Sequence, residues 1–137
     1  MTPNHLRSAA ALIEQHGLHA AEGDFVAPDG ALDICAALYQ AATLELADAF
    51  RTDADAAIEL IKASPSAMAA IRAVYDTLGY EVTTPDEVDP EAVIDSVSRW
   101  AMSAPFPDMQ PPTRTEVIGR LVRTADALDQ QATPLAA

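Results

Sequence analysis

Apolar side chains recur every three or four positions along most of the chain, which is the spacing of helices that bury one face. The first such segment, about residues 4–16, ends before Gly17, a residue suited to the left-handed C-terminal cap of a helix. A second segment begins near residues 31–33 and continues either to Thr43 or toward Phe50. The remaining segments with this pattern are residues 52–61, 64–79, 89–101 and 113–128. No stretch alternates long enough to compete as a sheet, so we predict an all-α fold, a compact bundle of five to six short helices.

Capping residues mark four of the predicted helix starts. Two starts place a Ser or Asp cap before a proline at the first helical position, and two carry a Thr followed three residues later by an acid. These starts are Ser64-Pro65, Asp89-Pro90, Thr113 with Glu116, and the weaker pair Thr52 with Asp55. Residues 18–30 are rich in turn formers, with a short extended piece at 24–27, and residues 80–89 and 105–112 are connections. We expect one domain over residues 1–131 and a frayed C-terminal tail at 132–137.

Composition narrows the classes of function. The chain has 137 residues, is 50% apolar with only 5% aromatic residues, and carries a formal net charge of −13. Such a charge repels phosphate backbones and anionic lipid surfaces, so we expect no direct nucleic-acid partner and no membrane association. No apolar run approaches the roughly 20 residues of a spanning helix, and the N-terminus lacks the features of a secretory signal, which predicts a cytoplasmic location. The single cysteine, Cys35, rules out an internal disulfide framework.

A low-ranking candidate site lies around two histidines and the cysteine. His16, His19, Cys35 and Tyr39 could line a ligand pocket between helices, with Tyr75 as a further member. Further carboxylates near them are Glu14, Asp24, Asp29 and Asp33. Their spacing matches no metal motif, and Gly17 separates the histidines, so we predict no metal site and no cofactor. The simpler interpretation places His16 at a helix C-terminus, His19 in a solvated loop and Cys35 in the core.

Other motifs of catalysis are missing from the sequence. No serine lies in a nucleophile-elbow pattern, and the five glycines form neither a dinucleotide-binding nor a phosphate-binding loop. Acid pairs such as Asp53 with Asp55 lie at helix starts, where carboxylates stabilise exposed N–H groups. Capping therefore explains these acids without a catalytic role, and the chain is not expected to be an enzyme.

The last third of the chain suggests an interaction surface. Trp100 either fills the core or forms an exposed patch with Met102, Phe106 and Met109, because tryptophan and methionine are enriched at interfaces. The final predicted helix carries Arg114, Arg120 and Arg123, which could dock an acidic surface, including one on a second copy of the chain. We take Trp100, Met102, Phe106, Arg120 and Arg123 as candidate interaction residues.

These segments together resemble a small uncharacterised family of all-helical proteins of high-GC bacteria. The resemblance rests on a helix ending in His16-Gly17, a helix of small residues after Cys35, and Trp100 followed by Thr113 to Val117. It spans most of the chain and implies no known activity.

Three hypotheses about function follow. The first is a non-catalytic interaction or regulatory module that binds a protein partner or itself, with a homodimer as one form. The second is a small-molecule or metal-binding protein, or an enzyme, with a pocket between helices. The third is an acidic mimic of nucleic acid that inhibits a DNA-binding protein.

Overall fold

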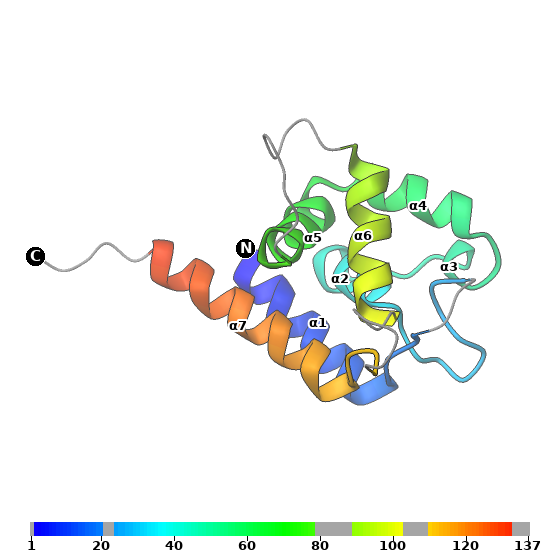
Figure 1. Cartoon of the computed structure of the whole chain (residues 1–137). Helices are drawn as coiled ribbons and strands as arrows, with labels where there is room; N and C mark the ends of the chain where they lie inside the picture. Colours follow the sequence, from blue (N-terminus) through cyan, green and yellow to red (C-terminus); the bar gives the residue numbers. More distant parts are fainter. Residues whose placement is uncertain (1, 21–23, 79–88, 103–109, 133–137) are drawn as a thin grey trace, which may run out of the picture.

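A computed structural model describes residues 2–20, 24–78, 89–102 and 110–132 (Figure 1). Within them the chain forms seven helices, which confirms the all-α prediction. These are α1 (Thr2–His16), α2 (Ile34–Thr43), α3 (Ala49–Thr52), α4 (Ala54–Lys62), α5 (Pro65–Thr77), α6 (Pro90–Met102) and α7 (Arg114–Ala132). Phe106, Met109, the connection at 80–88 and the tail at 133–137 lie outside the described residues.

The predicted count of five to six helices is wrong because α3, a helix of four residues before Asp53, is an element of its own. Asp53 has an extended backbone, φ −148° and ψ 92°, so the helical hydrogen bonds cannot continue through it. Its side chain instead caps α4, accepting a hydrogen bond of 3.1 Å from the N–H of Ala56. The cap of this helix is therefore Asp53 and not Thr52, and the four residues of α3 stand alone.

The other predicted helix starts are confirmed. Ser64 caps α5 through a 3.2 Å bond from Ala67 N–H, with Pro65 at the first helical position. At α7 the N–H of Glu116 donates to Thr113 Oγ1 at 3.1 Å, and Thr113 N–H donates back to Glu116 Oε1 at 3.3 Å. These reciprocal bonds are the capping box that the sequence predicts.

The ends of α1 and α2 follow from residues with positive φ. Gly17, with φ +95°, donates its N–H to the carbonyl of Ile13 at the end of α1, as the sequence predicts. At the end of α2 the same left-handed conformation falls on Leu44, with φ 63°, whose N–H donates to Gln40 O. The second helix therefore ends at Thr43 and does not reach Phe50.

Helix α2 lies at the centre of the fold and contacts α1, α5 and α6 (Figure 1). Six of its ten residues are buried, and they are mostly small: Ile34, Cys35, Ala36, Ala37, Leu38 and Ala41. Small side chains let neighbouring helices approach this one closely on several sides.

The first helix runs antiparallel to α7, where Arg7 pairs with Asp126 at 2.9 Å and with Asp129. Among the described helices, none has the length and apolar character that a membrane span requires.

The segment before α2 is held by backbone pairing. Leu32 forms isolated β-bridges with Leu18 and with Val26, so the expected extended piece at 24–27 includes one bridging residue. Val26 N–H also donates to Phe50 O at 3.0 Å, and Asp33 N–H donates to Phe25 O at 2.8 Å. These bonds fix Phe25 and Asp33 at the start of α2.

Candidate functional site

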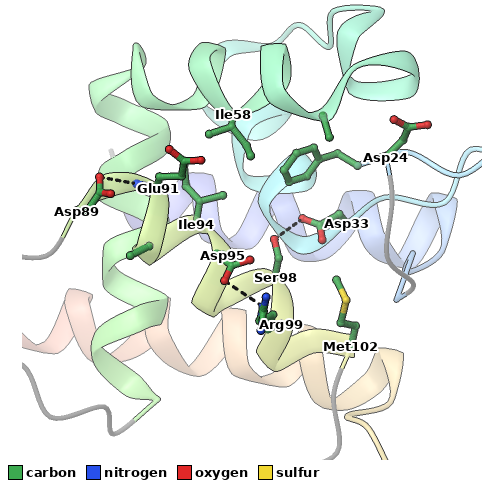
Figure 2. A pocket seen from close by; sticks show the side chains of 13 residues that line it. Asp24, Asp33, Ile58, Asp89, Glu91, Ile94, Asp95, Ser98, Arg99 and Met102 are labelled. Carbon is green, nitrogen blue, oxygen red and sulfur yellow. Dashed lines mark hydrogen bonds and ion pairs between the residues drawn. The ribbon is translucent and has the colours of Figure 1, made fainter.

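A cavity of about 530 Å³ lies between the segment that precedes α2, the helix α4 and the helix α6 (Figure 2). Phe25 and Asp33 come from the segment before α2, and Ile58 comes from α4. The helix α6 supplies a wall of residues spaced three or four apart, with Ile94, Ser98 and Met102 on one face. The cavity therefore combines apolar side chains with polar and charged groups from the same elements.

Asp33 is the most buried charged group of this wall, with 4% of its surface exposed. It is the N-cap of α2, and its Oδ1 accepts a 2.7 Å hydrogen bond from Cys35 N–H. Its backbone carbonyl accepts from Ala37 N–H at 3.0 Å, which begins the helical pattern. Aspartate is a common N-cap residue before an apolar helical run. Capping of its own helix therefore holds the carboxylate of Asp33 in position.

Ser98 connects α6 to that carboxylate. Its hydroxyl donates to Asp33 Oδ1 at 3.2 Å and lies 3.3 Å from Cys35 Sγ, as Figure 2 shows for the pair with Asp33. The thiol of Cys35 in turn donates to the carbonyl of Ile94 at 3.6 Å. The result is a small polar network between two helices, with Asp33 and Ser98 also lining the cavity.

Burial changes the acid–base behaviour of both acidic groups of the network. Desolvation raises the pKa of Asp33 to about 6, while hydrogen bonds from Cys35, Ser98 and Ala36 act in the opposite direction. Desolvation, followed by the negative charge of Asp33, raises the pKa of Cys35 well above its ordinary value. The thiol therefore stays protonated at neutral pH and serves as a hydrogen-bond donor. A protonated thiol is a poor nucleophile, since the thiolate is the reactive form.

The mouth of the cavity is acidic. Asp24, Asp89, Glu91 and Asp95 line it together with a single arginine, Arg99. Arg99 Nε is 3.0 Å from Asp95 Oδ2, so this guanidinium is already paired. Among the described residues, no three His, Cys, Asp or Glu side chains are arranged to hold a metal ion.

Comparison with protein families gives one match. The family model of DUF6197, a family of unknown function, matches residues 1–127. The chain belongs to DUF6197. Every residue of the cavity falls within the matched range. Searches of curated proteins and of solved structures return no match.

In this DUF6197 protein the four predicted ligand-binding residues do not line the cavity. His16 is exposed at the end of α1, and His19 is half-buried with its backbone N–H bonded to Leu32 O at 2.8 Å. Cys35 is fully buried, and the ring of Tyr39 packs against that of Phe50 with centroids 4.8 Å apart. Of the four, the structure brings only Cys35 into the network beneath the cavity.

The predicted interaction residues also have defined places. Trp100 is half-buried against the core, and the guanidinium carbon of Arg120 lies 5.3 Å from the centroid of its ring. Arg120 Nη1 also donates to Thr77 O at 3.2 Å. Arg123 is exposed on α7, whereas Met102 is half-buried and lines the cavity. Trp100 and Arg120 therefore contact each other, while Met102 belongs to a different part of the surface.

Sequence reasoning missed Ser98 entirely and considered Asp33 only as one of several loop carboxylates. A signal for each exists in the sequence. Asp33 directly precedes an apolar run, which predicts an N-cap held against the core. Ser98 interrupts the inner stripe of α6, one turn after Ile94, where a polar side chain requires a hydrogen-bond partner.

Proposed function

We propose that this protein binds a small organic molecule in the cavity between the segment before α2, α4 and α6. The observation that carries this proposal is the buried carboxylate of Asp33, which opens onto the cavity with Ser98 beside it. Ligand sites in proteins are typically concave, mostly apolar and about 300–1,000 Å³ in volume, with a few well-placed polar groups. The cavity has a volume in this range, about 530 Å³, and combines the apolar side chains of Phe25, Ile58 and Met102 with a charged mouth.

The polar groups of the cavity are held in place before any ligand arrives. Asp33 is fixed by its bond to Cys35 N–H, and Ser98 is fixed by its bond to Asp33. The ring of Phe25 packs edge-on against Phe50, with centroids 5.9 Å apart. Preorganised groups lose little conformational entropy on binding, which favours ligand affinity.

Binding is proposed and not catalysis, because the network offers no activated nucleophile. The high pKa of Cys35 keeps its thiol protonated. Within the described part of the chain, the hydrogen-bond partners of the Ser98 hydroxyl are Asp33 and Cys35, and a histidine is not among them. The activated serine of most hydrolases depends on such a base.

Nuclear magnetic resonance with a charge-diverse fragment library tests this proposal. We expect fragments to shift the backbone amides of Phe25, Ile58 and Ser98 in the wild-type protein. Ala54 lines the cavity, so Ala54→Phe should fill it and abolish these shifts. Ala69 is exposed on α5, and Ala69→Phe is the matched control that should leave them unchanged. The proposal is wrong if no fragment moves the cavity amides, or if the same fragments bind the Ala54→Phe variant equally well.

The interaction hypothesis is a second proposal, and one observation favours it. Leu44 is 87% exposed and lies in a left-handed backbone conformation, so it combines an exposed apolar side chain with a strained backbone. The backbone conformation is explained by the capping of α2 through the bond to Gln40 O, so the exposed side chain is the observation that favours an interaction. A homodimer that buries Leu44 would be observed by analytical ultracentrifugation. Leu44→Asn should dissociate this dimer, because asparagine tolerates the left-handed conformation but replaces the apolar side chain with a polar one. A wild-type protein that sediments as a monomer would exclude this form of the hypothesis.

A further inference from the structure

The charges around the cavity are strongly one-sided. Among the residues that the structure describes, five carboxylates line it, against one arginine that is paired with Asp95. Two of these carboxylates have partial compensation, since Lys62 Nζ approaches Glu91 at 3.7 Å and Asp89 accepts the N–H of Glu91 at 3.2 Å. Figure 2 shows the acidic groups around the opening, with Asp33 facing Ser98. The electrostatic potential in the cavity therefore favours a cation.

Asp33 adds a more specific requirement. Its hydrogen bonds come from neutral donors, the N–H of Cys35 and the hydroxyl of Ser98. No ion pair to this carboxylate occurs among the residues that the structure describes. Buried charges in proteins are normally paired with an opposite charge or bound to a metal, because an isolated charge is costly to remove from water. A cation placed in the cavity would supply the missing partner.

The remaining lining distinguishes an organic cation from a metal ion. A metal ion needs several convergent ligands, and in the described ranges no group of three acidic, histidine or cysteine side chains provides them. Phe25, Ile58, Ile94 and Met102 instead present apolar surface next to Asp33. This surface can cover a hydrocarbon body, and an aromatic ring also attracts an ammonium group.

We propose that the ligand of this cavity is an organic ammonium compound, with its cationic group at Asp33 and Ser98 and its apolar body against Phe25, Ile58 and Met102. This inference rests on the proposed ligand-binding function. The ligand is thereby assigned a positive charge and an orientation in the cavity.

Three indoles that share one ring system and differ in charge test the inference. Tryptamine is cationic, tryptophol is neutral and indole-3-acetate is anionic. Titrations at pH 8, followed through the cavity amides, should give tryptamine the lowest dissociation constant, about tenfold or more below that of tryptophol, with indole-3-acetate the weakest. Equal or tighter binding of tryptophol or indole-3-acetate overturns the ammonium assignment and leaves the ligand-binding proposal standing. Failure of all three to shift the cavity amides also overturns the ammonium assignment, whereas the fragment library decides the ligand-binding proposal.

Asp33→Asn locates the cationic group. Asparagine caps helices as well as aspartate does, so this variant keeps the start of α2 and removes the charge. We expect tryptamine affinity to fall about tenfold or more while tryptophol affinity stays within about twofold. Asp53→Asn is the control, because Asp53 caps α4 in the same way but is exposed and does not line the cavity. Should Asp33→Asn not fold, Asp24→Asn at the cavity mouth should still weaken tryptamine binding by about twofold. Unchanged tryptamine affinity in the variant that folds overturns the inference.

Discussion

Ser98 on α6 donates a hydrogen bond of 3.2 Å to Asp33 at the start of α2, across 65 positions of sequence. Both side chains are buried, so this bond joins the central helix to the wall of the cavity with little exposure to water. A hydrogen bond to a buried charged group contributes more to stability than one between neutral groups, because water cannot replace the lost donor. The bond therefore makes the geometry of the cavity depend on the packing of α6 against α2.

Ser98→Ala removes this donor and should destabilise the protein. We expect the free energy of unfolding to fall by about 1–3 kcal/mol at pH 8, where Asp33 is ionised, and by less at pH 5, where the carboxyl is mostly protonated. Urea denaturation at the two pH values measures the difference. Ser96→Ala is the matched control on the same helix, since Ser96 is half-buried and does not line the cavity. A loss for Ser98→Ala that is the same at both pH values would show that the bond does not depend on the charge of Asp33.

Asp33→Asn should change how stability depends on pH. The pKa of Asp33 is about 6 in the folded protein and 3.8 in an exposed carboxyl, so the folded state binds more protons between these values. The free energy of unfolding should therefore decrease, through this group, as the pH rises from about 4 to about 6, by at most about 3 kcal/mol. Asparagine cannot ionise, so the variant lacks this decrease and should be more stable than the wild type above pH 6.

Denaturation curves at intervals from pH 4 to pH 8 measure this effect. The stability difference between Asp33→Asn and the wild type should grow with pH and level off above about pH 7. All other ionisable groups of the cavity and network are the same in both proteins: Asp24, Cys35, Asp89, Glu91, Asp95 and Arg99. Asp53→Asn controls for exchange of a capping carboxylate at an exposed helix start. A difference that is flat over the whole range would mean that Asp33 titrates as an exposed group.

The helices could be predicted from the sequence because their signals are local. Ser64 and Thr113 cap their helices through residues three positions away, and Gly17 ends α1 through its own φ angle. The short helix α3 was not predicted, and the start of α4 was predicted one residue early, since Thr52 and Asp53 are adjacent residues that can both cap a helix.

The cavity could not be predicted, because it depends on contacts between distant segments. Asp33 and Ser98 meet only when α6 packs against α2, and neither residue carries a motif of its own. Cys35 was correctly expected on the inner face of its helix, but its neighbours were not. His16 and His19 were considered as a shared site, but Gly17 was already expected to end the first helix between them, and in the structure α1 ends there and leaves His16 exposed.

Arg120→Met should loosen the contact between α6 and α7. The change keeps most of the apolar stem of Arg120 and removes the guanidinium that stacks on Trp100 and donates to Thr77 O. We expect a loss of about 1–2 kcal/mol in the free energy of unfolding. Trp100 is the single tryptophan, so its fluorescence emission should also move to longer wavelength as water reaches the ring.

Arg123→Met provides the control for this variant, since Arg123 is exposed on the same helix. It should leave both the stability and the emission maximum close to those of the wild type. If both substitutions have equal effects, net charge and not the contact with Trp100 determines the stability of this region.

Leu44→Gly should stabilise the protein, although it replaces a large side chain with none. Leu44 has φ 63° and ψ 14°, a left-handed conformation that crowds the Cβ atom of any residue other than glycine. Its side chain is 87% exposed, so little packing is lost when it is removed. We expect the free energy of unfolding to rise by about 1 kcal/mol, since the relief of strain exceeds the extra freedom that glycine gives the unfolded chain.

Leu44→Ala separates the effect of the backbone from that of the exposed side chain, because it shortens the side chain but keeps the Cβ atom. It should give little or no gain. Urea denaturation of the three proteins measures the effect, and an equal gain from alanine would assign it to the exposed side chain and not to the backbone.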